Sequence, residues 1–236
     1  MIYSVFATLD TTLYEGTSGT ADAFMKYTNT GNDEILEVRK IVSSSTTAAT
    51  YLSRALVYFP IDWGNINSGT AWTGAAYLNL HTTEISQLDD STPKFNVRPI
   101  ATSWTEGRGR ENNKPQTLKG ASWVNRSGEH TTGTAWQTSG YAANTSGSNG
   151  SEHDGGGTWN TTHHSDYSLT DSTEDLRIAV KDIVGAWSSS TYDNRGFIVS
   201  LTQSQEQDTN RYGSFKFFSR NTHTIYPPRL EICWDD

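Results

Sequence analysis

The stretch from Ser146 to Asp166 gathers side chains that could bind a metal ion. It holds three histidines, two aspartates and one glutamate among glycine, serine, threonine and asparagine. Imidazole and carboxylate groups bind Zn²⁺, Mn²⁺ or Ni²⁺, and they could converge if the stretch closes on itself. The candidate ligands are His153, Asp154, His163, His164 and Asp166.

Two properties of this stretch argue against a metal centre. Catalytic ligands need rigid elements and supporting hydrogen bonds, and the composition here favours neither helix nor strand. The spacing also matches no zinc signature. We therefore expect a polar, solvated loop and no cofactor, and no motif indicates a structural calcium ion. A trimer axis that brought symmetry-related histidines together would reverse this expectation.

Glu106 and Glu111 could act as the acid and base of a glycosidase, because such enzymes use paired carboxylates. They flank Arg108 and Arg110 in a single expected loop, where the guanidinium groups would keep both carboxylates ionised. We therefore expect salt-bridged surface carboxylates. Cys233, the single cysteine, is expected to be a small core residue and not a reactive thiol. We expect no catalytic residue.

Aromatic residues outside the strand-like runs are the stronger functional candidates. Trp and Tyr provide a large rigid surface with a polar tip, which suits protein interfaces and sugar-binding platforms alike. We expect these side chains to be exposed and favour interface contacts over glycan binding. The candidates are Trp72, Trp123, Trp136, Tyr141 and Trp159.

Length and composition limit the framework that could position these groups. The 236 residues carry a net charge of −8, which disfavours binding to a nucleic-acid backbone. Hydrophobic residues make up only 34%, but 11% of the chain is aromatic, which favours short strands with long polar loops over disorder. The first residues do not resemble a signal peptide, and no apolar run is long enough to span a bilayer. We expect synthesis in the cytoplasm and no membrane partner.

Alternation of apolar and polar residues indicates strands through most of the chain. The clearest runs are 34–42, 54–59, 76–82, 95–101, 176–180, 196–202, 215–218 and 229–234. One or two helical turns are expected at 181–187, with Ile183, Val184 and Trp187 facing inward. The pattern predicts an all-β fold.

Residues 125–168 contain no Leu, Ile, Val, Met or Phe. Such a segment cannot bury enough apolar surface to form a core of its own. We therefore expect residues 1–236 to form a single β-sandwich domain, with 125–168 as a polar insertion that packs partly on the sandwich or on a neighbouring subunit.

Several stretches, in this order, resemble DNRLRE-type β-sandwich domains, which are similar to non-catalytic carbohydrate-binding modules. They are "SRALVYFPI" (53–61), "AAYLNL" (75–80), "FNVRPIATSWTEG" (95–107), "LRIAVKDIVGAWSSSTYDNRGFIVSL" (176–201) and "FFSRNTHTIYPPRLEICWDD" (217–236). The last of these and the opening "MIYSVFATLDTTLYEG" resemble small virion structural proteins of tailed phages, especially those infecting cyanobacteria. The resemblance implies a jelly-roll sandwich located in the virion.

Three functions follow as hypotheses. The first is a non-enzymatic virion structural protein of the head, neck, tail or baseplate, multimeric and acting through contacts with other virion proteins. The second is a carbohydrate-binding module that recognises host-surface glycan, and the third is a polysaccharide hydrolase. A large apolar interface would favour the first, an open aromatic platform the second, and a cleft with converging carboxylates the third.

Overall fold

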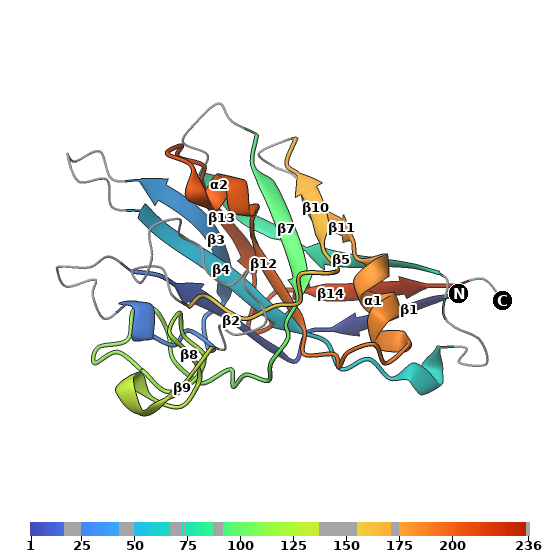
Figure 1. Ribbon diagram of the computed structural model, residues 1–236, viewed down its shortest axis with the longest axis horizontal. Helices are drawn as coiled ribbons and strands as arrows, with labels where there is room; N and C mark the ends of the chain where they lie inside the picture. Colours follow the sequence, from blue (N-terminus) through green and yellow to red (C-terminus); the bar gives the residue numbers. More distant parts are fainter. Residues whose placement is uncertain are drawn as a thin grey trace.

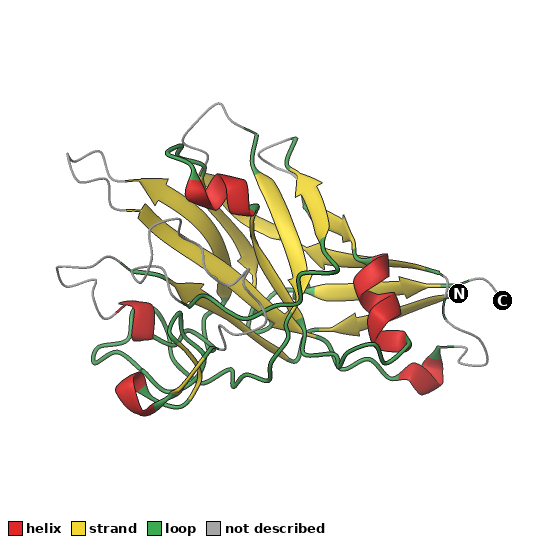
Figure 2. Ribbon diagram, in the orientation of Figure 1, coloured by secondary structure: helices red, strands yellow, loops and turns green. Residues whose placement is uncertain are grey.

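Two antiparallel sheets pack face to face in this chain (Figures 1 and 2). The computed structural model describes residues 1–16, 25–42, 50–66, 72, 74–86, 92–136, 155–170 and 175–234. The predicted all-β sandwich is confirmed. Within the described segments, no helix is long and apolar enough to cross a membrane.

The smaller sheet has four strands in the order β1–β14–β5–β11, and each runs antiparallel to its neighbours. The strands are β1 (Ile2–Phe6), β14 (Arg229–Cys233), β5 (Ala75–Leu80) and β11 (Leu176–Ala179). Strand β1 therefore lies at one edge of this sheet and β11 at the other.

The larger sheet has eight strands, seven of them in the order β10–β7–β12–β4–β3–β13–β6, and β2 also pairs with β4. Its strands are β10 (Ser165–Ser168), β7 (Lys94–Pro99), β12 (Phe197–Leu201), β4 (Thr50–Tyr58), β3 (Ile35–Val42), β13 (Gly213–Phe218), β6 (Thr82–Ser86) and β2 (Leu9–Tyr14).

The chain passes from one sheet to the other between β1 and β2. The amide of Ala7 donates to the carbonyl of Pro228 at 3.0 Å, which ends the pairing of β1 with β14. The next amide, that of Thr8, donates to the carbonyl of Tyr58 at 3.0 Å in the larger sheet. The first strands therefore tie the two sheets together at one point.

The space between the sheets is filled by the inward residues of both. Leu36 and Val38 of β3 point inward, and helix α1 (Lys181–Ser188) closes one side of this core. Ile183, Val184 and Trp187 of α1 are buried, as predicted, and the Trp187 ring lies 4.7 Å from that of Phe197. The remaining short elements are η2 (Trp63–Asn65), β8 (Asn125–Ser127), η3 (His130–Thr132), β9 (Thr134–Ala135) and α2 (Gln203–Gln207).

A second apolar cluster, here called the outer core, covers the opposite face of the larger sheet. Strand β4 is buried on both faces, because Ala55 and Val57 belong to the core between the sheets while Leu52 and Leu56 belong to the outer core. The outer core consists of Leu13, Leu52, Leu56, Ile100, Ala121, Trp123, Trp136, Trp159 and Ile198.

Part of the segment predicted to be an insertion supplies this cover. Residues 165–168 form β10, which pairs with β7 in the larger sheet, and 125–136 contribute β8 and β9. The composition of 146–166 favoured neither helix nor strand, and this expectation was wrong for Ser165 and Asp166, which belong to β10. Tryptophan and backbone hydrogen bonds replace the aliphatic residues whose absence suggested a loop.

Arg54 lies inside the outer core with only 1% of its surface exposed. Its Nε and Nη2 donate to the two carboxylate oxygens of Glu206 at 3.0 and 2.7 Å, and its Nη1 donates to the carbonyl of Gly156 at 2.8 Å. The guanidinium carbon lies 4.8 Å from the ring centroid of Trp123 and 5.0 Å from that of Trp159. These contacts join β4, α2 and residues 156–159.

A second buried cation binds the C-terminal end of α2. Lys40, on β3, is fully buried, and its Nζ donates to the carbonyls of Gln205 and Asp208 at 2.5 Å each. The Asp208 carboxylate lies 2.6 Å from the same nitrogen and completes the ion pair. Strands β3 and β4 therefore hold α2 by two buried charges.

We expect Arg54→Ala to lower the free energy of unfolding by about 3–5 kcal/mol, because it leaves the buried Glu206 carboxylate without its partner. Urea unfolding at neutral pH measures this loss. Lys216→Ala is the matched control, because its ion pair with Glu84 is solvent-exposed and should contribute no more than about 1 kcal/mol. Equal losses in the two variants would show that the buried ion pair of Arg54 matters no more to stability than an exposed one.

Candidate functional site

The candidate metal ligands are not brought together in the part of the chain that the structure describes. His153 and Asp154 lie outside the described residues. His164 is exposed, while the His163 ring contacts that of Tyr192, with 5.6 Å between centroids. Asp166 is on β10 and accepts a hydrogen bond from Asn96 Nδ2 at 2.5 Å. Among the described residues, no group of three or more His, Cys, Asp or Glu is arranged to hold a metal.

Most of the predicted surface aromatics are buried. Trp123, Trp136 and Trp159 are 1%, 4% and 7% exposed, so the expectation of exposure was wrong for all three. The reason is the outer core, where these indoles cover the apolar outer face of β2, β4 and β12. Trp72 is partly buried and donates from Nε1 to the carbonyl of Cys233 at 3.2 Å. Tyr141 lies outside the described residues.

Cys233 was predicted to be a core residue, but it is partly exposed. The alternation of β14 turns Leu230 and Ile232 into the core, which places Cys233 on the outer face of the smaller sheet.

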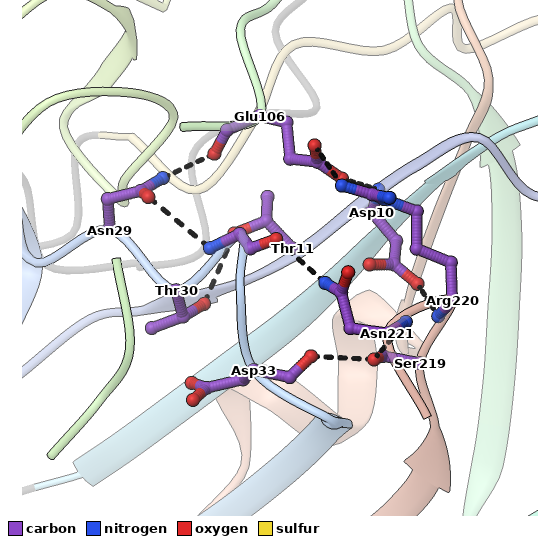
Figure 3. Close-up of polar contacts among 10 residues, drawn as sticks. Asp10, Thr11, Asn29, Thr30, Asp33, Glu106, Ser219, Arg220 and Asn221 are labelled. Carbon is purple, nitrogen blue, oxygen red and sulfur yellow. Dashed lines mark hydrogen bonds and ion pairs between the residues drawn. The ribbon is translucent and has the colours of Figure 1, made fainter. Parts of the chain in front are cut away.

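Glu106 is buried and does not form the predicted surface salt bridge with Arg108 or Arg110. Figure 3 shows its carboxylate facing the guanidinium of Arg220, with Nε to Oε1 at 2.5 Å and Nη2 to Oε2 at 2.6 Å. Asp10 lies beside this ion pair and accepts a hydrogen bond from the Arg220 amide at 2.6 Å. This cluster of Asp10, Glu106 and Arg220 is called the acidic lock below.

The second predicted carboxylate also has different surroundings from those expected. Glu111 is partly buried, and its amide donates to the Asp33 carboxylate at 3.0 Å. Burial, followed by the nearby Glu37 carboxylate, raises the pKa of Glu111. The Arg110 guanidinium lies 3.9 Å from Glu34. The contacts of Glu106 and those of Glu111 therefore involve different residues.

The acidic lock covers the free edge of β2. The Asp10 amide, which points away from β4, donates to Glu106 Oε1 at 2.7 Å. The Thr12 amide donates to Thr30 Oγ1 at 3.0 Å, and that hydroxyl donates to the Thr12 carbonyl at 2.8 Å. Asn29 fixes the covering segments, because its Nδ2 donates to the Glu106 carbonyl at 2.5 Å (Figure 3) and to the Ala121 carbonyl at 2.8 Å. Side chains therefore satisfy the β2 edge as a neighbouring strand would.

The electrostatics of the lock resemble those of a catalytic carboxyl pair. Burial raises the pKa of Asp10 to about 7, and the Glu106 carboxylate adds to the shift. A carboxyl group whose pKa lies near neutrality can serve as a general acid or base. Here, however, Asp10 is 1% exposed and Arg220 engages both oxygens of Glu106, so the arrangement offers no place for a substrate. The sequence did not indicate that Arg220 would pair with Glu106.

The largest exposed apolar side chains among the described residues lie at β1 and on the turn that leads to β14. Ile2 and Phe6 of β1 are 70% and 52% exposed, and Ile225 and Tyr226 are 82% and 45% exposed. The turn that carries Ile225 and Tyr226 leads to Pro228, whose carbonyl accepts the Ala7 amide at the end of β1. The outward face and edge of β1, with this turn, are called the β1 surface below.

A polar pocket of about 470 Å³ opens where β7 ends and the chain leaves α1. Hydroxyl and amide side chains dominate its lining, which consists of Ile100, Ala101, Thr102, Ser103, Asn160, Ser190, Thr191, Tyr192, Asp193 and Arg195. The Tyr192 hydroxyl is buried without a hydrogen-bond partner among the described residues, as is Nδ1 of the adjacent His163. Burial raises the pKa of Tyr192 to about 12, so the hydroxyl stays protonated.

Comparison with known proteins gives no further assignment: no family model matches this chain, and no curated protein matches it significantly.

We expect Asp10→Asn to stabilise the protein relative to the native chain progressively as the pH rises from about 4 to 7. The pKa of Asp10 in the folded chain lies above its ordinary value of 3.8. The stabilisation that this carboxyl group contributes to the folded state is therefore fully present below pH 3.8 and is lost as the pH rises through 7. An amide cannot ionise, so the variant should gain up to about 1.4 kcal/mol per pH unit in this window.

Urea unfolding of both proteins at pH 4.5, 6.0 and 7.5 measures this difference. The exposed Asp193 provides the control, because Asp193→Asn should show no comparable trend. If the difference in free energy of unfolding between Asp10→Asn and the native chain stayed constant with pH, burial would not be what sets the pKa of Asp10.

Proposed function

We propose that this chain is a non-enzymatic structural protein of a tailed-phage virion and that it acts through protein–protein contacts. The observation that carries the proposal is the β1 surface, where Ile2, Phe6 and Ile225 are at least half exposed. The resemblance of the first and last residues to small phage virion proteins supports the same function.

The chemistry of the β1 surface suits a protein partner. Its exposed side chains are apolar, while nearby charges on the smaller sheet neutralise each other: Glu231 lies 2.6 Å from Arg229 and 3.2 Å from Arg177. Apolar and aromatic side chains free of unpaired charge are typical of the centre of protein interfaces.

The position of the chain in the particle can be tested on purified virions of the phage that encodes it. We expect mass spectrometry to find the chain in several copies per particle and antibodies against it to label intact particles at one structure. Its presence in infected cells but absence from purified particles would contradict the proposal. Release of sugar from host polysaccharide by the purified chain would instead favour the hydrolase.

Recognition of host-surface glycan is the second candidate function, and the polar pocket beside Tyr192 favours it. Sugars are bound by hydroxyl, amide and charged side chains with an aromatic ring nearby, and this pocket provides each of these. Tyr192 supplies the aromatic ring of this lining, and its hydroxyl has no hydrogen-bond partner among the described residues.

A glycan array with the purified chain tests this candidate. If the pocket binds glycan, Thr102→Trp should abolish the signal by filling the pocket, whereas Ser86→Trp on β6, outside the pocket lining, should not. Absence of binding, or binding that survives Thr102→Trp, would rule out the pocket as the glycan site.

A further inference from the structure

The edge strands of the two sheets differ in charge. Exposed charged residues occur on β11 (Arg177), β6 (Glu84) and β10 (Asp166). Strand β1, with the sequence Ile-Tyr-Ser-Val-Phe, carries none. Charges on an edge strand discourage pairing with another chain, so an apolar edge without them marks a place where a strand can be added.

The outer edge of β1 has backbone groups available for such pairing. The carbonyl of Pro228 receives the amide of Ala7, which places Ala7 and every second residue before it on the β14 side. The amides and carbonyls of Ile2, Ser4 and Phe6 therefore point away from β14. Among the described residues, no strand pairs with this side of β1.

We propose that β1 pairs antiparallel with β1 of a second copy of this chain, about a two-fold axis at Ser4. This inference rests on the proposed use of the β1 surface for protein contacts. In this register, Ile2 opposes the partner's Phe6 on the outer face, and Tyr3 opposes the partner's Val5 on the inner face. About six inter-strand hydrogen bonds would join the two small sheets into one continuous sheet.

The sequence of β1 is compatible with pairing to a second copy of itself. Its alternating residues match when the strand is reversed, because the apolar Ile2 and Phe6 lie at equal distances on either side of Ser4. With no charge on the strand, self-pairing brings no like charges together. A two-fold axis requires such self-complementarity, since each patch meets its own copy.

Light scattering and sedimentation over a range of concentrations test the dimer. We expect the native chain to dimerise and Ser4→Lys to weaken the dimer by about ten-fold or more, because two lysines would face each other across the axis. Ala179→Lys, on the exposed face of β11 at the opposite edge of the same sheet, is the matched control and should dimerise like the native chain.

The two-fold register makes a sharper prediction. Because position 4 faces itself, an equimolar mixture of Ser4→Lys and Ser4→Glu should recover a heterodimer. In a Cys233→Ser background, Ser4→Cys should form an intermolecular disulfide, since opposed residues lie about 5.5 Å apart between Cα atoms. Ile2→Cys should not cross-link with itself, because this register separates the two copies by about 13 Å.

If the chain remained a monomer at high concentration, the proposal that a second copy pairs with β1 would be wrong, and a strand of another protein would be the expected partner. A dimer unaffected by Ser4→Lys, or one in which Ile2→Cys cross-links better than Ser4→Cys, would overturn the interface or its register. These outcomes are independent of whether the chain is found in purified virions, so failure of this inference is distinguishable from failure of the proposed function.

Discussion

A guanidinium group buried between two indole rings determines how the outer half of this protein is arranged. A charge removed from water must be paired and hydrogen-bonded, or the fold loses several kcal/mol. Arg54 therefore needs the Glu206 carboxylate from α2 and the Gly156 carbonyl at the same time. The faces of Trp123 and Trp159 complete its surroundings, since aromatic rings attract cations. Strand β4, helix α2 and residues 156–159 are consequently all held by contacts with the Arg54 side chain.

The same constraint explains why so polar a segment packs in a core. Gly156 has φ +70, and a Cβ there would lie 2.5 Å from Arg54 Nη1 and 2.8 Å from the Trp123 ring. Only glycine lets the backbone approach closely enough for its carbonyl to reach the guanidinium. Large indoles then provide the apolar area that a run of aliphatic residues would otherwise supply. In this covering segment, glycine allows the backbone to pack closely and tryptophan supplies the buried apolar area, a role that aliphatic residues such as leucine and valine fill between the sheets.

Side-chain periodicity records which face each residue presents, and it predicts β3, β4, β5, β7, β11 to β14 and α1, but the strands β1, β2 and β6 did not stand out in the sequence. It cannot show what covers the outer face of the larger sheet, and so it leaves Trp123, Trp136 and Trp159 at the surface. One signal in the sequence points to the cover: Leu52 and Leu56 face away from Ala55 and Val57 on β4, which indicates a strand buried on both sides. The acidic lock is beyond sequence reasoning, because Glu106 and Arg220 are 114 positions apart and meet only in the folded chain.

The two sheet edges at the start of the chain, those of β1 and β2, are treated in opposite ways. Along β2, Glu106 and Thr30 bind the amides that point away from β4, so that edge cannot receive another strand. The acidic lock does this at a cost, since Asp10 is held where its charged form is disfavoured. A few residues earlier, β1 has neither such a cover nor a charge to repel a partner among the described residues. The β2 edge is thus closed by contacts around the buried Asp10 and Glu106, whereas the β1 edge is apolar and open among the described residues, and this contrast supports the proposed pairing of β1.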